Sequence, residues 1–235
     1  MNVVEVSDVR FSWRKAAAFA LDIPKFTIAA GEKVLLLGPS GSGKSTFLSL
    51  IAGILEPQAG RIVVRGTEIS KLSPAARDRF RAAEIGIIFQ MFNLLPYLSC
   101  LDNVVLALAF GPERRRRAEA AGPAADEARR LLSRLGIDPA VYADKSAVEL
   151  SVGQQQRVAA ARALIGRPGL VIADEPTSSL DRNAQEAFLA LLLEEIAAAD
   201  AALLMVSHDQ SFASRFDRVV ALDAILRQST VGAPL

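Results

Sequence analysis

A glycine-rich stretch that ends in a lysine and hydroxyl residues has the residue types and spacing of a polyphosphate site. Its members are Gly38, Pro39, Ser40, Gly41, Ser42, Gly43, Lys44, Ser45 and Thr46. The spacing G-x-x-x-x-G-K-S lets the backbone turn its N–H groups inward around phosphates, and the following helix start adds partial positive charge. We expect Lys44 to act as a point charge on the β- and γ-phosphates and the Ser45 hydroxyl to be a ligand of Mg²⁺.

Other candidate catalytic groups follow apolar runs farther along the chain. Asp174 and Glu175 follow the run 170–173, and we expect Asp174 to serve the metal and Glu175 to polarise a water against the γ-phosphate. Gln90 follows the run 85–89, and its amide can reach metal and water. His208, the one histidine, follows the run 203–206. Taken alone, such a glutamine is usually a surface residue and a lone histidine is usually structural.

A second helix start with anion-binding character lies at 150–154. Ser151, Gly153 and Gln154 stand where the helix 155–165 begins, so they could bind a phosphate or only cap the helix. Two such helix starts with a single glycine-rich loop suggest a composite site. In that site the second start of one copy would close over the nucleotide of another copy.

Alternating strands and helices must position these residues. The glycine loop lies between a short apolar strand, 34–37, and a helix that ends near Gly53, and the same alternation returns after residue 150. The predicted fold is α/β with a mostly parallel sheet core, an N-terminal antiparallel β part and a helical subdomain. We place the core at about 1–90 and 150–235 and the helical subdomain at about 91–149. Because sites lie at the carboxyl ends of parallel strands, these candidate residues can share one crevice.

The bulk composition argues against several function classes. With 27 basic and 26 acidic residues the formal net charge is +1, so nothing indicates nucleic acid as a partner. The one basic run, Arg114 to Arg117, is interpreted as part of a solvated loop. The single cysteine, Cys100, is typical of a reducing compartment. No apolar run approaches the ~18 residues of a membrane span, and the N-terminus lacks signal-peptide character.

Taken together, the motifs resemble the ATP-binding subunit of an ABC transporter over nearly the whole chain. The matching elements are the Walker A motif at 38–45, the Q-loop at Gln90, the signature at 150–154, Walker B with the catalytic glutamate at 170–175, the D-loop at 178–181 and the switch histidine at His208. The resemblance implies an ATPase that uses ATP and Mg²⁺. Ser45, Gln90 and Asp174 would hold the metal, and Glu175, His208 and Gln90 would serve catalysis.

The resemblance also implies a homodimer that encloses two ATP molecules. Ser151, Gly153 and Gln154 of one copy would face the γ-phosphate bound by the other copy, and Asp181 would cross the interface. In the family an aromatic residue near the N-terminus stacks on adenine. Phe11 and Trp13 are both candidates, and we favour Trp13. The alternative is that Trp13 packs in the core.

The signature departs from the family pattern at one position. The family usually has a glycine where this chain has Val152, and a β-branched residue narrows the backbone freedom there. We hypothesise that Val152 slows or restricts dimer closure.

The segment 89–104 resembles a subgroup that serves lipoprotein release and macrolide-type export. In that subgroup the permease has few membrane spans and a large extracytoplasmic domain, and the segment after the Q-loop forms the groove that receives its coupling helix. Because this chain has no room for a membrane domain of its own, we expect the FtsX-like permease to be a separate protein. Met91, Phe92, Leu94, Leu95 and Tyr97 form an apolar cluster in a predicted loop, which would either contact the permease or fill the local core. The resemblance places the chain in the cytoplasm, peripherally on the cytoplasmic face of the inner (plasma) membrane.

Two other interpretations stay open at this point. A soluble signature-containing ATPase acting on DNA would share these motifs, although such chains carry long coiled-coil or zinc insertions. A P-loop kinase would need neither signature nor dimer. The transported substrate and the direction of transport have no signal in the sequence, because such ATPase subunits contact ATP and the permease.

Overall fold

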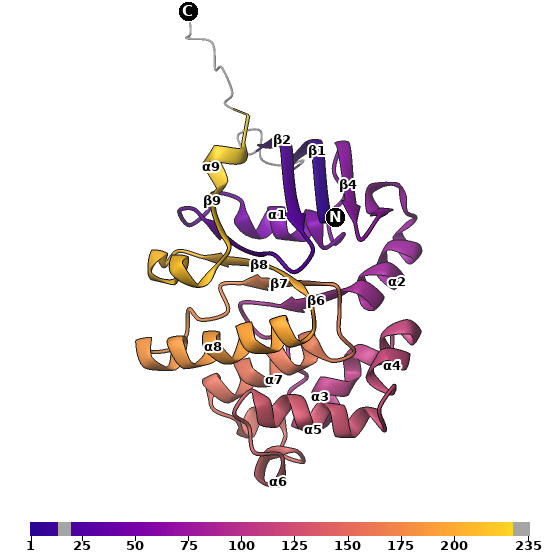
Figure 1. Cartoon of the computed structure of the whole chain (residues 1–235), viewed down its shortest axis with the longest axis vertical. Helices are drawn as coiled ribbons and strands as arrows, with labels where there is room; N and C mark the ends of the chain where they lie inside the picture. The colour runs from indigo at the N-terminus through magenta and orange to yellow at the C-terminus, as the bar shows by residue number, and fades with distance from the viewer. Residues whose placement is uncertain (14–19, 228–235) are drawn as a thin grey trace, which may run out of the picture.

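The computed structural model describes residues 1–13 and 20–227 and arranges them in layers (Figure 1). An antiparallel sheet lies at one end, a parallel sheet crosses the middle, and most helices pack beneath it. This arrangement confirms the predicted α/β class with a parallel core and an N-terminal antiparallel part. The boundaries proposed for the helical subdomain stay a prediction.

The antiparallel sheet is built from the first part of the chain. Its order is β2 (Ala20–Ala29), β1 (Asn2–Ser12), β4 (Ala59–Val64) and β5 (Thr67–Glu68), followed by the 3-10 turn η1 (Ile69–Lys71). Val4 and Val6 are buried along β1, but the next buried residues are Val9 and Phe11, because Asp8 adopts a left-handed φ of 48° and the pairing register shifts there. The bulge decides which later residues of β1 face the core.

The parallel sheet has the order β6-β7-β8-β3-β9, and every neighbouring pair is parallel. Its members are β6 (Ile85–Ile88), β7 (Leu170–Asp174), β8 (Ala202–Ser207), β3 (Lys33–Leu37) and β9 (Arg218–Ala221). β3, β6, β7 and β8 are short apolar runs that are mostly buried, as expected of a covered parallel sheet, whereas the edge strand β9 is mostly exposed. The strand order brings the carboxyl ends of β3, β6, β7 and β8 to one edge.

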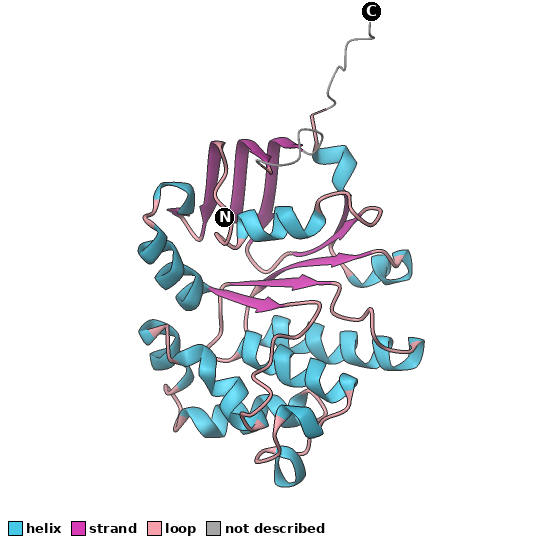
Figure 2. Cartoon of the chain, turned by 180° about the vertical axis from the view of Figure 1, so that it is seen from behind, coloured by secondary structure: helices cyan, strands magenta, loops and turns pink. Residues whose placement is uncertain are grey.

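Helices cover both faces of the parallel sheet. The helix α1 (Lys44–Ile51), which follows the glycine loop, lies between the two sheets (Figure 1). Its Phe47, Leu50 and Ile51 are fully buried in a core that the two sheets share. The other face packs on α7 (Val152–Leu164) and α8 (Arg182–Ala198), as Figure 2 shows from behind. α2 (Pro74–Glu84) leads into β6. The remaining elements after β8 are η4 (Gln210–Arg215) and α9 (Leu222–Ile225).

Short helices fill the segment between β6 and α7. They are α3 (Cys100–Val105), η2 (Leu106–Leu108), α4 (Pro112–Ala118), α5 (Ala124–Arg134), α6 (Pro139–Tyr142) and η3 (Ala147–Glu149). Leu131, Leu132 and Val104 from these helices join the core that covers the lower face of the parallel sheet. α3 is short and continues directly into the 3-10 turn η2.

The interpretation of the arginine run as a solvated loop is wrong. Arg114 to Arg117 lie in α4, and Arg114 is buried, with its guanidinium donating to the backbone carbonyls of Ile165, Ile85, Arg162 and Ala163. Arg117 donates to the carbonyls of Gly166 and Ala83. Burial and the neighbouring Arg117 lower the pKa of Arg114 to about 10. Arg114 thus joins the end of α7 to the start of β6.

Candidate nucleotide-binding site

The glycine loop leaves backbone donors free at the start of α1. Gly43 occupies the N-cap position with a φ of 104°, and no side chain caps the helix. Gly41 also has a left-handed φ, of 76°, and such values favour glycine. Lys44 is 6% exposed, and its Nζ donates to the carbonyls of Gly38 and Pro39, each at 2.8 Å. The loop therefore presents uncapped N–H groups beside an ammonium that is already positioned.

A cavity of about 420 Å³ opens over this loop. Its lining residues come from just after β1, from the glycine loop 38–45 (the P-loop) with the start of α1, and from just after β6 and β7. They are Trp13, Ser40, Gly41, Gly43, Lys44, Ser45, Thr46, Gln90 and Glu175. Of the residues expected to share a crevice at the strand ends, Lys44, Gln90 and Glu175 line this cavity, whereas Asp174 and His208 do not. A concave site with polar groups converging on backbone donors suits a phosphorylated ligand.

Asp174 lies at the end of β7 beside the P-loop. Burial raises the pKa of its carboxyl, while a hydrogen bond with the Ser45 side chain and the charge of Lys44 oppose that shift. Ser45 and Asp174 are therefore neighbours that offer oxygen atoms, the ligands that Mg²⁺ prefers. The donor set fits that ion.

Glu175 and His208 meet at the same edge. The Oε2 atom of Glu175 lies 3.5 Å from Nδ1 of His208, and the histidine side chain is two-thirds exposed. Glu175 has a left-handed φ of 44°, and its N–H donates to the carbonyl of Val206 at 3.1 Å. A left-handed non-glycine residue carries strain that β8 must support. The bond to Val206 thus directs the Glu175 carboxylate toward the pocket, a contribution that the sequence pattern did not reveal.

The structure separates the two aromatic candidates for adenine. Phe11 is 7% exposed and belongs to the core, whereas Trp13 is 47% exposed and lines the cavity. Their rings stand edge to face with centroids 5.2 Å apart. Phe11 therefore packs against Trp13, and among the residues that the structure describes only Trp13 presents an aromatic ring to the pocket.

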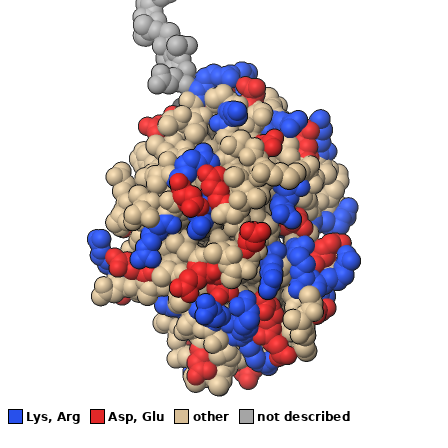
Figure 3. Space-filling model, viewed as in Figure 1, with Lys and Arg blue, Asp and Glu red and all other residues tan. Residues whose placement is uncertain are grey.

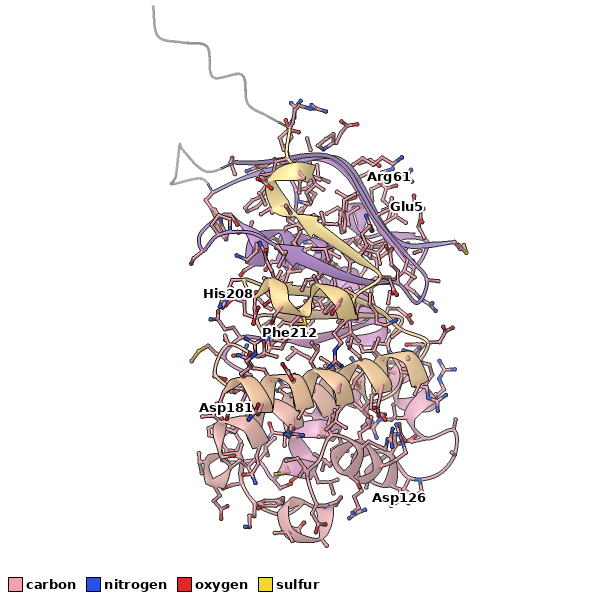
Figure 4. All side chains as sticks on the ribbon, turned by 60° about the vertical axis from the view of Figure 1, so that its left-hand side comes forward. Glu5, Arg61, Asp126, Asp181, His208 and Phe212 are labelled. Carbon is pink, nitrogen blue, oxygen red and sulfur yellow. The ribbon has the colours of Figure 1, made fainter. Side chains whose placement is uncertain are left out.

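The signature residues do not line this cavity. Ser151 caps α7, accepting a bond from the Gln154 N–H at 3.3 Å, while Gln154 Oε1 accepts one from the Ser151 N–H at 2.9 Å. Gly153 lies in the first turn beside Leu180, and Val152 is 49% exposed. Asp181 caps α8 and lies on the same side of the molecule as His208, as Figure 4 shows. Within one copy these residues are at the surface, outside the pocket.

The loop after Gln90 is held by two residues that the sequence reasoning missed. Asn103 is fully buried and bonds both backbone groups of Leu95. Arg162 of α7 donates to the carbonyls of Phe92 and Asn93. The sequence offered two signals for such a role: the polar Asn103 lies within an apolar helix, and Arg162 lies within an alanine-rich helix. Both side chains tie the loop to the helices around it.

The apolar cluster in that loop is only partly exposed. Phe92 is 9% exposed, which favours the alternative that this residue fills the local core, and its contact with a permease stays a prediction. Met91 and Tyr97 are 81% and 76% exposed, while Leu94 and Leu95 are half-buried. Phe110, which the sequence reasoning did not single out, is exposed and lines a groove with Ile87 and Phe89. Apolar surface of this extent needs a partner to explain it.

Charges of both signs are interspersed on the face shown in Figure 3. Many arginines pair with acidic residues, as Arg130 and Arg134 do with the buried Glu195. Paired charges of this kind create little long-range electrostatic field.

Among residues 1–13 and 20–227, the structure has no helix that is both long enough and apolar enough to cross a membrane.

The fold and the pocket define a P-loop ATPase, and comparison with known proteins identifies the family. The family model described as ABC transporter matches residues 21–178, so this chain belongs to the ABC transporter ATP-binding proteins. It is an ATPase subunit that couples ATP hydrolysis to transport.

Named relatives refine the family. The lipoprotein-releasing system ATP-binding protein LolD of Anaeromyxobacter dehalogenans is 43% identical, over 83% of this chain and 79% of the relative. LolD of Pseudomonas fluorescens is 40% identical, over 82% and 81%. An uncharacterized ABC transporter ATP-binding protein of Mycobacterium tuberculosis is 39% identical, over 94% and 86%. The chain thus resembles the subgroup that was expected from the segment after Gln90.

Solved structures agree with this assignment. The dimeric bacterial ABC transporter cassette MJ0796 superposes with a TM-score of 0.77 at 31% identity, covering 93% of each chain. A dimeric post-hydrolysis state of MJ0796 bound to ADP and phosphate gives a TM-score of 0.76 at 32% identity, with the same coverage. The fold is therefore that of an ABC ATPase cassette.

Proposed function

We propose that this chain works as a homodimer that closes on two ATP molecules and thereby drives a separate FtsX-like permease. The observation that carries the proposal is the division of the phosphate-binding groups. The P-loop, Gln90 and Glu175 surround one cavity, whereas Ser151, Gly153, Gln154 and Asp181 lie at the surface outside it. A second copy would bring those residues to the cavity. The dimeric state of the MJ0796 cassette supports this arrangement.

Within each copy the P-loop holds the phosphates. The uncapped N–H groups of α1 and the Lys44 ammonium bind the β- and γ-phosphate oxygens, and Lys44 exchanges its two carbonyl partners for them. Ser45, Asp174 and Gln90 would hold Mg²⁺. When bound, Mg²⁺ would neutralise phosphate charge and polarise the γ-phosphoryl group. Trp13 stacks on the adenine.

Hydrolysis depends on the pair of residues at the ends of β7 and β8. Glu175 accepts a proton from the attacking water, and the strained backbone keeps its carboxylate aimed at the cavity. His208, 3.5 Å from Glu175, contacts the γ-phosphate and holds the water geometry. Asp181 of one copy crosses to the other.

The docking surface for the permease is the apolar part of the loop after Gln90. Met91 and Tyr97 are its exposed residues, the half-buried Leu94 and Leu95 lie between them in the loop, and the groove beside Phe110 extends the surface. The LolD relatives belong to lipoprotein-releasing systems, which supports a membrane partner. We therefore place the chain in the cytoplasm, peripherally on the cytoplasmic face of the plasma membrane.

Trapping the closed dimer tests the proposal. Glu175→Gln keeps the shape of the side chain but removes the base, so hydrolysis should fall by about a hundredfold or more while ATP binding persists. On a sizing column the variant should elute as a dimer with ATP–Mg²⁺ and as a monomer without it. Glu113→Gln, an exposed change on α4, should behave as wild type. A monomer under both conditions, also when Val152→Gly is added, would contradict ATP-driven closure.

A further inference from the structure

The end of β1 next to the nucleotide cavity is held by the side chain of Gln58. Its Oε1 accepts a hydrogen bond from the Ser12 N–H at 2.7 Å, and its Nε2 donates to the Ser12 carbonyl at 2.8 Å. The Gln58 backbone N–H donates to the carbonyl of Arg10 at 2.9 Å. Gln58 therefore bonds two residues of β1 that point the same way, one through its backbone and one through its side chain.

A proline explains why a side chain is needed at this position. Regular pairing of β1 with β4 ends at Arg10 and Ala59. The residue before Gln58 is Pro57, which has no N–H to donate to the next carbonyl of β1. The primary amide of Gln58 has the same donor and acceptor as a peptide group, so it extends the ladder by one rung. Without it, the backbone of Ser12 would lose its partners on the β4 side.

The residue after this rung is Trp13. Its indole borders the nucleotide cavity on one side and, on the other, a hollow of about 670 Å³ lined by Phe11, Leu55 and Gln58. The Phe11 ring contacts the indole edge to face, which limits its tilt, but the position of the Trp13 backbone follows from Ser12. Fixing both backbone groups of Ser12 therefore fixes where the indole stands relative to Lys44 and Thr46.

We propose that Gln58 is a positioning residue for base recognition, which holds the Trp13 indole where the adenine of ATP stacks. This inference rests on the proposed function, because it assigns Trp13 to adenine. The hydrogen bonds of Gln58 go to Arg10 and Ser12 and not to the P-loop, so we expect its effect at the base end of the nucleotide. Since Gln58 is exposed, water competes for its bonds, and the expected effect is moderate.

The test compares ATP with inorganic tripolyphosphate, which has the phosphates but no base. Gln58→Ala should weaken ATP binding about threefold to tenfold and leave tripolyphosphate binding unchanged. Ser12→Ala is the matched control, since it removes only the hydroxyl, 3.4 Å from Gln58 Oε1, and keeps both backbone bonds. Because Trp13 is the single tryptophan, its fluorescence reports the site directly. Acrylamide should quench it more strongly in Gln58→Ala than in wild type or Ser12→Ala.

Trp13→Ala separates the assignment of Trp13 to adenine from the positioning role of Gln58. If it leaves ATP affinity unchanged, the assignment of Trp13 to adenine fails, and the role of Gln58 in base recognition fails with it. If Trp13→Ala weakens ATP binding but Gln58→Ala does not, only the positioning role is overturned. Equal losses for ATP and tripolyphosphate in Gln58→Ala would also overturn it, since the change would then act on the P-loop.

Discussion

The two helix starts that resemble phosphate sites are built in opposite ways. At the start of α1 no side chain caps the helix, and glycine at the N-cap leaves the first backbone donors without partners in the helix. At the start of α7 the reciprocal bonds of Ser151 and Gln154 satisfy two of these donors. The first start is prepared for a ligand, whereas the second is stable by itself.

This difference assigns an order to the two sites. The α1 start, with the Lys44 ammonium beside it, can bind phosphate in a single copy. The α7 start gains a ligand only if the Ser151 hydroxyl, already engaged with an N–H, also reaches a γ-phosphate presented by another copy. Binding and closure are therefore separable steps, and variants at each start should affect them differently.

Lys44→Ala should have the largest effect, because it removes the charge from the start that acts first. The ATP affinity of the single copy should fall about tenfold to a hundredfold, as expected when a charged hydrogen-bond donor is lost. Isothermal titration with ATP–Mg²⁺ measures this change. Lys25→Ala, an exposed lysine on β2, should bind ATP as wild type does. Unchanged affinity in Lys44→Ala would mean that the α1 start is not the primary phosphate site.

Ser151→Ala should leave nucleotide binding by one copy intact but lower ATPase activity about tenfold or more. The lost cap should also lower the free energy of unfolding by about 1 kcal/mol. Ser73→Ala removes the cap of α2 and should have a similar stability cost without changing turnover, so denaturant unfolding and steady-state ATPase together separate the two effects. Full activity in Ser151→Ala would contradict the composite site and favour an active site that is complete within one copy.

Val152→Gly should give the smallest change. Glycine restores backbone freedom at the first position of α7, so ATP-driven dimerisation and ATPase activity should rise about twofold to fivefold, with up to about 1 kcal/mol of stability lost. Val152→Ala removes the branched side chain without giving glycine's freedom, and it should lie between wild type and Val152→Gly. If both variants match wild type, Val152 does not limit closure.

Local patterns predicted much of this molecule. The apolar runs before Gly38, Gln90, Asp174 and Ser207 are strands of one parallel sheet, because a strand covered on both faces has to be apolar throughout. Once the strands are parallel, the residues after them share an edge. The P-loop, Gln90 and Glu175 could therefore be placed together from sequence alone.

What the sequence did not predict depends on distant partners. The bulge at Asp8 shifts the alternation of buried residues from Val4 and Val6 to Val9 and Phe11, which is why Phe11 lies in the core. It forms where Gly60 lets the strands approach so closely that a Cβ would lie 2.3 Å from the Asp8 carbonyl oxygen. Arg114 is buried because carbonyls from β6 and α7 converge on it. Neither fact is visible in a short window of residues.

The order of strands in the parallel sheet has a consequence for how the protein is made. β3, which leads into the P-loop, lies between β8 and β9 in the sheet, where Leu35 pairs with Met205 and with Val219. A ribosome therefore releases the complete Walker A sequence long before either neighbouring strand exists. The antiparallel sheet, formed within residues 2–68, can pair early, but the nascent nucleotide site has to wait for the last strands before its own strand has support.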